Sequence, residues 1–192
     1  MPSEKKLKEE ITLLGRFLYE RGFFFATTGN ISARMREVVF ITPRGRCKGE
    51  LSPKEISKIS LKGKVISGEP SSEWRMHLGI YGVRQSVKAV IHAHSPFATF
   101  ISFLGKLKIL RFDAYSETHL GEIRFISYFK PGSEELAEAV AEAVGKNPES
   151  DIFILKRHGA VVLGKDLKEA RLNLERLEFF ARLFWLIKGY KI

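Results

Sequence analysis

The sequence predicts a single α/β domain over residues 1–192, in which helices sandwich a mixed, largely antiparallel sheet. Near both ends of the chain, apolar residues recur every three or four positions, which is the periodicity of helices. Short apolar runs bounded by turn residues fill the middle, and several lie close enough in sequence to form hairpins. Strands and helices that mix without strict alternation are typical of a sheet with helices on both faces.

The first half of the chain predicts two helices with short strands between them. Apolar residues over 7–18 lie at helical spacing, and Gly22 is a natural end for this helix. The pair Ser71-Ser72 is expected to cap a second helix that begins with Glu73 and continues to Ile80. Turn residues bound each apolar run between these helices. The strands expected here are 30–34 and 38–42, which form a hairpin, 56–61 and 64–66.

The second half predicts more strands and two longer helices. Ser133 is expected to cap a helix that ends at Gly145. Asp166 and Glu169 resemble a capping box, which opens a last helix that reaches Phe184. A small helix or turn is expected near 96–103. The strands expected in this half are 88–91, 107–110, 123–128, 151–155 and 160–163.

The composition predicts a soluble cytoplasmic protein without a nucleic-acid or membrane partner. The first ten residues are polar and charged, so no signal peptide is expected, and the apolar runs are too short to cross a bilayer. The net charge of +10 favours anionic partners, but the basic residues are scattered and form no nucleic-acid motif. We assign this charge mainly to a heat-adapted surface, with some attraction for an anionic substrate. The single cysteine, Cys47, excludes an internal disulfide.

Two histidines at the end of the expected strand 88–91 predict half of a metal site. Side chains on a strand alternate between its faces, so His92 and His94 point the same way. Two imidazoles held on one face of a strand end are a rigid pair of ligands for a divalent metal, and the alternative is a strand end that carries two polar side chains into solvent. A catalytic metal typically has three protein ligands and one open position, so a third ligand is expected from elsewhere.

Three other histidines are candidates for that third ligand. His158 follows the apolar strand 151–155 and precedes a glycine, where backbone segments can approach closely, so its position favours it. His77 lies one helical turn after Glu73 and is expected to pack in the core or to support the ligands. His119 lies in a polar turn and is expected to be exposed.

An acidic residue and three hydroxyl-rich turns predict proton transfer and anion binding. Glu73 is expected in the first turn of its helix, either as a charge that stabilises the helix dipole or as a general acid or base beside the metal. The turns combine small hydroxyl or amide side chains with tight backbone, so they can present several donors to one phosphate. They lie at 27–30, 42–45 and 71–72.

Five short motifs occur in a fixed order across most of the chain. Each is weak by itself, but the combination is specific. They are Gly-Asn-Ile-Ser at 29–32, Ile-Thr-Pro-Arg-Gly at 41–45, Ser-Ser-Glu-Trp-Arg at 71–75, His-Ala-His-Ser at 92–95 and Arg-His-Gly-Ala at 157–160. Together they resemble the zinc-dependent class II aldolase family, whose fold is shared by the adducin head domain.

The resemblance implies a fold, an activity and a set of site residues. It implies a mixed sheet between helices and a four-fold symmetric homotetramer with active sites between subunits. It implies reversible cleavage of a ketose 1-phosphate, such as L-fuculose 1-phosphate, to dihydroxyacetone phosphate and an aldehyde. One zinc ion per subunit would be held by His92, His94 and His158, and Glu73 would be the proton shuttle. The residues implied for the phosphate are Gly29, Asn30, Thr42, Gly45, Ser71 and Ser72.

The match to the family is imperfect at two positions. Other reactions also occur on the same fold. Arg44 stands where relatives usually carry Ser or Thr, and we expect it to contact the phosphate rather than point away. Tyr115 lies near the region where relatives carry a tyrosine that acts on the leaving aldehyde. A ketose-phosphate 4-epimerase and a methylthioribulose-1-phosphate dehydratase stay alternatives. A non-catalytic adducin-like protein is disfavoured, because such proteins lack the metal histidines.

Overall fold

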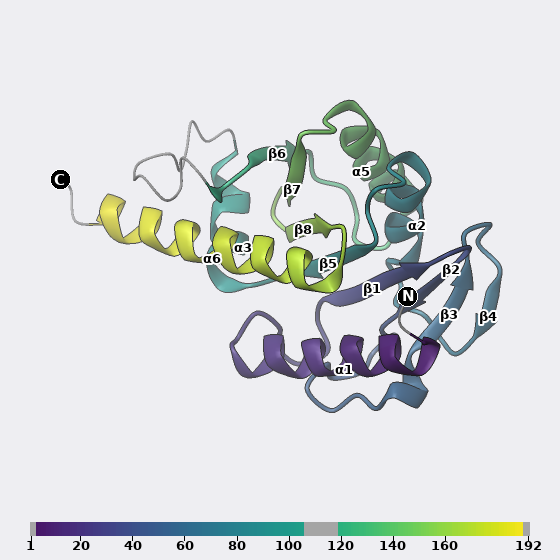
Figure 1. The fold of residues 1–192 in the computed structure, drawn as a ribbon. Coiled ribbons are helices and arrows are strands. Elements are labelled where there is room, and N and C mark those ends of the chain that lie inside the picture. The colour runs from purple at the N-terminus through teal and green to yellow at the C-terminus, as the bar shows by residue number, and fades with distance from the viewer. Residues whose placement is uncertain (1–2, 106–118, 190–192) are drawn as a thin grey trace.

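A computed structural model describes residues 3–105 and 119–189, and it shows one mixed sheet with helices on both faces (Figure 1). This confirms the fold class expected from the sequence. The strands are β1 (Asn30–Met35), β2 (Val38–Ile41), β3 (Ser57–Ser60), β4 (Val65–Ser67), β5 (Ala89–Ala93), β6 (Glu122–Ile126), β7 (Ser150–Leu155) and β8 (Gly159–Gly164). The helices are α1 (Glu4–Glu20), the short 3-10 helix η1 (Pro53–Glu55), α2 (Trp74–Val83), α3 (Pro96–Leu104), α5 (Glu134–Lys146) and α6 (Leu167–Gly189).

The sheet places β5, the histidine strand, between strands from distant parts of the chain. The strand order is β4-β3-β2-β1-β5-β8-β7-β6, and each neighbouring pair is antiparallel except β6 and β7, which are parallel. The register sets His92 opposite Asn30 of β1 and opposite Val161 of β8. The centre of the site therefore lies where the N-terminal and C-terminal parts of the sheet meet.

The two faces of the sheet bury two separate apolar clusters. Helices α1, α3 and α6 cover one face, and α2 and α5 cover the other (Figure 1). On β5, Ala89 and Ile91 belong to the first cluster and Val90 belongs to the second, as expected from the alternation of a strand. His92 shares the parity of Val90, so its side chain points toward the α2 side of the sheet.

Helix α2 begins later than the sequence predicts, and this changes the place of Glu73. The N-cap is Glu73 itself, and the helix starts at Trp74. The reason is a turn that precedes the helix. In this turn the backbone N–H of Trp74 donates to the Ser71 carbonyl oxygen, and the backbone N–H of Glu73 donates to the Ser71 hydroxyl. Ser71 and Ser72 are therefore turn residues rather than caps. Glu73 makes no side-chain cap hydrogen bond, which leaves its carboxylate available to the histidines.

Other expected elements differ from the structure mainly at their ends. The helix predicted to begin after Ser133 is α5, and the Ser133 hydroxyl accepts a hydrogen bond from Leu136, as expected of a cap. The sequence did not indicate η1. The strand expected at 107–110 lies outside the described residues. Among the described helices, none combines the length and the apolar character needed to cross a membrane.

Candidate active site

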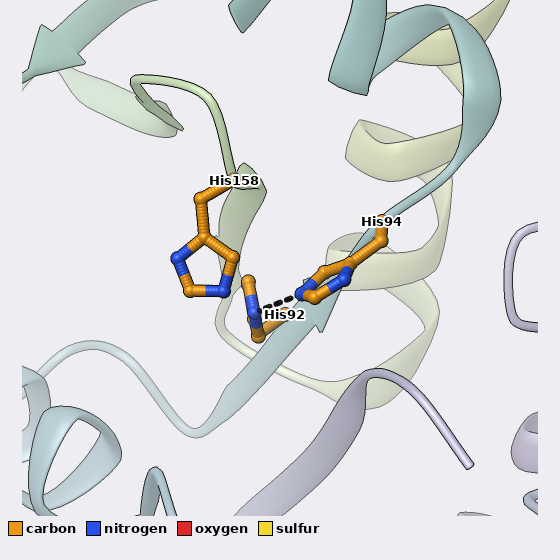
Figure 2. Close-up of side chains that lie close together, drawn as sticks. All are labelled: His92, His94 and His158. Carbon is orange, nitrogen blue, oxygen red and sulfur yellow. Dashed lines mark hydrogen bonds between the residues drawn. The ribbon is translucent and has the colours of Figure 1, made fainter. Parts of the chain in front are cut away.

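Three histidines from two distant segments meet at one end of β5. His92 is in β5, His94 follows it, and His158 lies in the turn between β7 and β8. Figure 2 shows their rings converging, with centroid separations of 4.7, 4.7 and 4.8 Å. One nitrogen from each ring lies within 4.8 Å of the other two. The structure thus brings together the three side chains that the sequence predicts as metal ligands.

A glycine after His158 allows the turn to approach β5 this closely. A Cβ atom on Gly159 would lie 2.4 Å from the carbonyl oxygen of Ala93, closer than any side chain tolerates. Arg157, just before His158, adopts a positive φ of 56°, which turns the chain sharply. The tight turn holds His158 beside His94.

Hydrogen bonding fixes which nitrogen of His92 faces the cluster. Its Nδ1 donates to the carbonyl oxygen of Ala160, 2.9 Å away, so its Nε2 is turned toward the other two rings. That Nε2 lies 2.8 Å from Nε2 of His94 (Figure 2). A backbone carbonyl that holds the far nitrogen of an imidazole is the usual support of a histidine metal ligand.

The charges in this cluster match those that a metal needs. Burial lowers the pKa of His94 to about 3 and that of His158 to about 4, and the charge of His92 adds to both shifts, so these rings are neutral near pH 7. Burial also opposes protonation of His92, but the Glu73 carboxylate outweighs it and raises the pKa of His92. A metal cation would take the place of that proton beside Glu73.

Glu73 lies against the histidine cluster rather than in solvent. Its Oε2 is 3.2 Å from Nε2 of His92, and its Oε1 is 3.5 Å from Nε2 of His158. Burial works to raise the pKa of Glu73, but His92, His158 and an Asn30 hydrogen bond together lower it, so the group is a carboxylate. Within the described ranges, Oε1 of Glu73 and Nδ1 of His158 are buried without a hydrogen-bond partner. These orphaned polar atoms, together with three imidazole nitrogens, fit a divalent metal with space for a substrate beside it.

A chain of buried hydrogen bonds orients Asn30 toward Glu73. Nδ2 of Asn30 donates to Glu73 over 3.0 Å, and Oδ1 of Asn30 lies 2.5 Å from Nε2 of His77. Nδ1 of His77 is 2.6 Å from the Ser32 hydroxyl, which is 2.8 Å from the Tyr81 hydroxyl.

The proton positions along this chain follow from His77. Burial lowers the pKa of His77 to about 3, so it is neutral and carries one ring proton. The Asn30 oxygen can only accept, so that proton is on Nε2, and Nδ1 accepts from Ser32. Each donor in the chain then points toward Glu73. Of the two roles expected for His77, packing in the core or supporting the ligands, this arrangement fits the second.

A cavity of about 200 Å³ opens beside the histidines and is lined by all three of the predicted anion-binding turns. His94, His158 and Glu73 also line it. Of the predicted anion-binding residues, those that line it are Gly29, Asn30, Arg44, Gly45, Ser71 and Ser72.

One predicted anion-binding residue, Thr42, does not line the cavity. Thr42 is fully buried, and its hydroxyl accepts a hydrogen bond from the Ile31 backbone at 3.1 Å, so it joins β1 to the end of β2 instead of lining the cavity. Tyr115 lies outside the described residues. His119 is exposed, as expected.

Comparison with known proteins identifies the family. The family model described as the class II aldolase and adducin N-terminal domain matches residues 9–185. The chain belongs to this family. The class II aldolase fold therefore accounts for nearly the whole molecule, and the motifs that first suggested it lie around one cavity.

Two relatives from the class II aldolase family that match most of this chain carry different names. An L-fuculose phosphate aldolase of Methanococcus maripaludis is 39% identical over 183 residues, which cover 95% of this chain and 98% of that protein. A 3-oxo-tetronate 4-phosphate decarboxylase of Haemophilus influenzae is 37% identical, covering 96% of this chain and 90% of that protein. The crystal structure of L-fuculose-1-phosphate aldolase from Thermus thermophilus has a TM-score of 0.85 at 28% identity, covering 97% of this chain and 96% of that one.

Two residues around this class II aldolase site are not indicated by the sequence. Lys48 lines the cavity, yet nothing in the sequence separates it from the other basic residues. Glu178 of α6 accepts hydrogen bonds from the Ser95 hydroxyl and from the backbone N–H groups of Phe97 and Ala98, at 2.7, 3.0 and 2.8 Å. Glu178 thereby caps α3 from a distant helix and holds the segment that follows His94.

Proposed function

We propose that this chain is a metal-dependent sugar-phosphate aldolase that reversibly cleaves a ketose 1-phosphate of the L-fuculose 1-phosphate type to dihydroxyacetone phosphate and an aldehyde. One observation carries the proposal. Two of the three converging imidazoles, His94 and His158, line one cavity together with Glu73 and the anion-binding turns, and His92 lies buried directly behind them. A phosphorylated substrate held by these turns would place its carbon skeleton against the histidines.

Each group of residues has a separate task in this proposal. His92, His94 and His158 would hold the metal, which we propose to be zinc because three neutral nitrogen ligands with an open position suit it. A bound metal supplies a Lewis acid that stabilises negative charge on substrate oxygens during carbon–carbon cleavage. The turns around Gly29 and Ser71 would hold the phosphate and so fix the reacting carbons.

Glu73 is the proposed proton carrier at C3 of the substrate. When the C3–C4 bond breaks, the C4 hydroxyl loses its proton and becomes the aldehyde carbonyl, while the electron pair of the broken bond stays on C3, which gains a proton. Because Glu73 starts as a carboxylate, it would take up a proton before it delivers one to C3, and the net reaction moves one proton from the C4 hydroxyl to C3. In the reverse direction, an ionised Glu73 would take that proton from C3. Asn30 supports this role, because its amide donates to Oε2 of Glu73 and leaves Oε1 facing the cluster.

Decarboxylation of a 3-oxo acid phosphate is the second candidate, because relatives at similar identity carry that name. It also breaks a carbon–carbon bond next to a carbonyl and leaves an electron pair on carbon that needs a proton. The same cavity, metal ligands and Glu73 could serve it. The sequence also left the 4-epimerase and dehydratase reactions as alternatives, and the same substrate assays can test them.

A substrate panel with and without metal tests the proposal. Purified protein should carry about one divalent ion per chain, as a site with three protein ligands predicts. The substrates are the 1-phosphates of fuculose, rhamnulose, ribulose and methylthioribulose, together with ribulose 5-phosphate and 3-oxo-tetronate 4-phosphate. We expect aldehyde release from fuculose 1-phosphate, its loss after chelation and its return with zinc. Turnover that persists without metal would overturn the proposed chemistry.

We also propose a homotetramer with active sites between subunits. Several large apolar side chains of α3 and α6 are exposed, including Phe103 at 61%, Phe179 at 57% and Trp185 at 48%. Helices α3 and α6 pack side by side, so these side chains lie on neighbouring elements (Figure 1). Exposed apolar surface of this kind is typical of subunit contacts. Light scattering coupled to size exclusion should give four times the chain mass, and a monomer would contradict the assembly but not the reaction.

A further inference from the structure

Lys48 is a buried lysine at the edge of the anion cavity. It lies in the loop between β2 and η1, lines the cavity beside Gly45 and Asn30, and is only 2% exposed. Lysine is among the residues least often buried, because its ammonium group loses hydration. The cost of burying this ammonium group suggests that the charge of Lys48 has a function.

Among the described residues Lys48 forms no close ion pair, and the Glu73 carboxylate acts on its charge only from beyond ion-pair distance. Its Nζ donates to the carbonyl oxygens of Thr27 and Arg46, at 2.5 and 3.0 Å. Both acceptors are neutral, and no ion pair joins Lys48 to a carboxylate among residues 3–105 and 119–189. An ammonium group has three N–H donors, so one of them remains for a ligand in the cavity.

The packing around Lys48 is built to hold it there. A Cβ atom on Gly15 of α1 would lie 2.9 Å from the Lys48 carbonyl oxygen and 3.5 Å from its Cβ. A Cβ atom on Gly49 would lie 2.6 Å from the Tyr19 ring. Glycine inside a helix lowers helix stability, so Gly15 indicates that close contact with the Lys48 segment matters more. The lysine is fixed by its surroundings and is not a mobile surface side chain.

The other basic residues of this loop are less suited to bind an anion in the cavity. Arg46 is exposed and pairs with Glu55 at 2.7 Å, so its charge is already matched. Arg44 lines the cavity but is exposed, where water screens its charge. Burial lowers the pKa of Lys48 to about 8, which still leaves most of it charged at neutral pH.

We propose that Lys48 is the fixed cation of this cavity and binds the phosphate group of the substrate directly, while its two carbonyl contacts hold the 27–30 and 45–48 segments together around that phosphate. The inference deepens the proposed function and rests on its phosphorylated substrate. Lys48 adds a buried charged donor to the anion-binding turns, for which the sequence indicated only neutral donors and Arg44. The charge-assisted hydrogen bond it provides is stronger than those from hydroxyl or amide groups.

Calorimetric titration with inorganic phosphate tests this on the metal-loaded protein. The variants are Lys48→Met, which keeps the length and removes the charge, and Lys48→Arg, which keeps the charge. Lys64→Met is the matched control, since Lys64 is exposed and lies outside the cavity. We expect Lys48→Met to weaken phosphate binding by about ten- to a hundredfold, the loss that one hydrogen bond to a charged group represents. Lys48→Arg should recover part of it, and the control should match the wild type.

Further readouts separate phosphate binding from a merely structural role. Circular dichroism and metal content should be unchanged in the Lys48 variants, and the loss in turnover should appear mainly in KM. Equal phosphate affinity in Lys48→Met and wild type would overturn the proposal, as would equal losses in Lys48→Met and Lys48→Arg. If the wild type binds phosphate through Lys48 but turns over none of the panel, the proposed function fails and the Lys48 site stands.

Discussion

Replacing Gly159 by alanine is expected to damage the metal site without touching any ligand. The added Cβ would lie 2.4 Å from the Ala93 carbonyl oxygen and 3.1 Å from Cδ2 of His94, so the turn must retreat by about 1 Å to reach ordinary van der Waals contact. The φ of 155° at this position adds strain for any residue with a side chain. Overpacking costs about 1–3 kcal/mol and such backbone strain about 1–3 kcal/mol, so we expect a total loss of about 2–6 kcal/mol of folding stability.

The same retreat moves His158 away from the other two imidazoles. Urea denaturation of the metal-free variant measures the stability loss, and competition with a chromophoric chelator measures zinc affinity. We expect affinity to fall about ten- to a hundredfold, the range seen when support around metal ligands is disturbed. A variant that keeps both its stability and its zinc affinity would refute the reasoning.

Gly82 provides a matched control for the same substitution. It lies in α2, and a Cβ there would meet nothing within 4 Å. Because alanine favours helix more than glycine does, Gly82→Ala should leave stability unchanged or raise it by up to about 1 kcal/mol. Zinc affinity should not change. A loss at Gly82 as large as that at Gly159 would show that the effect does not come from the close approach to β5.

Three further substitutions test the residues around the metal. Glu73→Gln should retain zinc but lose most of the exchange of the C3 proton of dihydroxyacetone phosphate with deuterium, followed by NMR; exchange at the wild-type rate would remove Glu73 from proton transfer. His77→Leu leaves the buried Oδ1 of Asn30 without its donor and the Ser32 hydroxyl without its acceptor, so urea denaturation should show a loss of about 1–3 kcal/mol, and proton exchange should slow while zinc content stays constant. Unchanged exchange would mean that His77 only packs. Glu178→Ala removes the cap of α3 and should cost about 1–2 kcal/mol of folding stability. It should also weaken zinc binding, because the segment after His94 loses its anchor. Unaltered zinc affinity in the chelator assay would show that His94 needs no such anchor.

The sequence predicted those parts of the site that depend on local periodicity. Alternation along a strand placed His92 and His94 on one face, and the short turn before Gly159 made His158 the best third candidate. The hydroxyl-rich turns around Asn30 and Ser71 were recognisable because small polar side chains and tight backbone occur together. Each of these signals involves residues that are close in the chain.

The parts that the sequence missed depend on contacts between distant residues. Glu178 caps a helix that begins about eighty residues earlier, and its spacing in α6 is that of any helical glutamate. His77 and Asn30 face each other only because α2 packs over β1, which the sequence does not specify. The sequence suggests that the Thr42 hydroxyl could bind an anion, but this hydroxyl already accepts a hydrogen bond from the backbone N–H of Ile31. Lys48 differs from other lysines only in its burial, which is a property of the finished fold.

The pairing of β5 with both β1 and β8 would give a metal bound by the three histidines a role in the folding of the whole chain. Its ligands can converge only after the C-terminal turn has docked against a strand from the first half, so an incomplete or partly unfolded chain lacks the site. A ligand that binds only the native state raises its stability by mass action, about 2.7 kcal/mol when free metal exceeds Kd a hundredfold. Metal supply would then set how long the protein survives heating or proteolysis, independently of any substrate. A metal bound by the three histidines would act as a reversible cross-link that forms last, after both halves of the chain have folded.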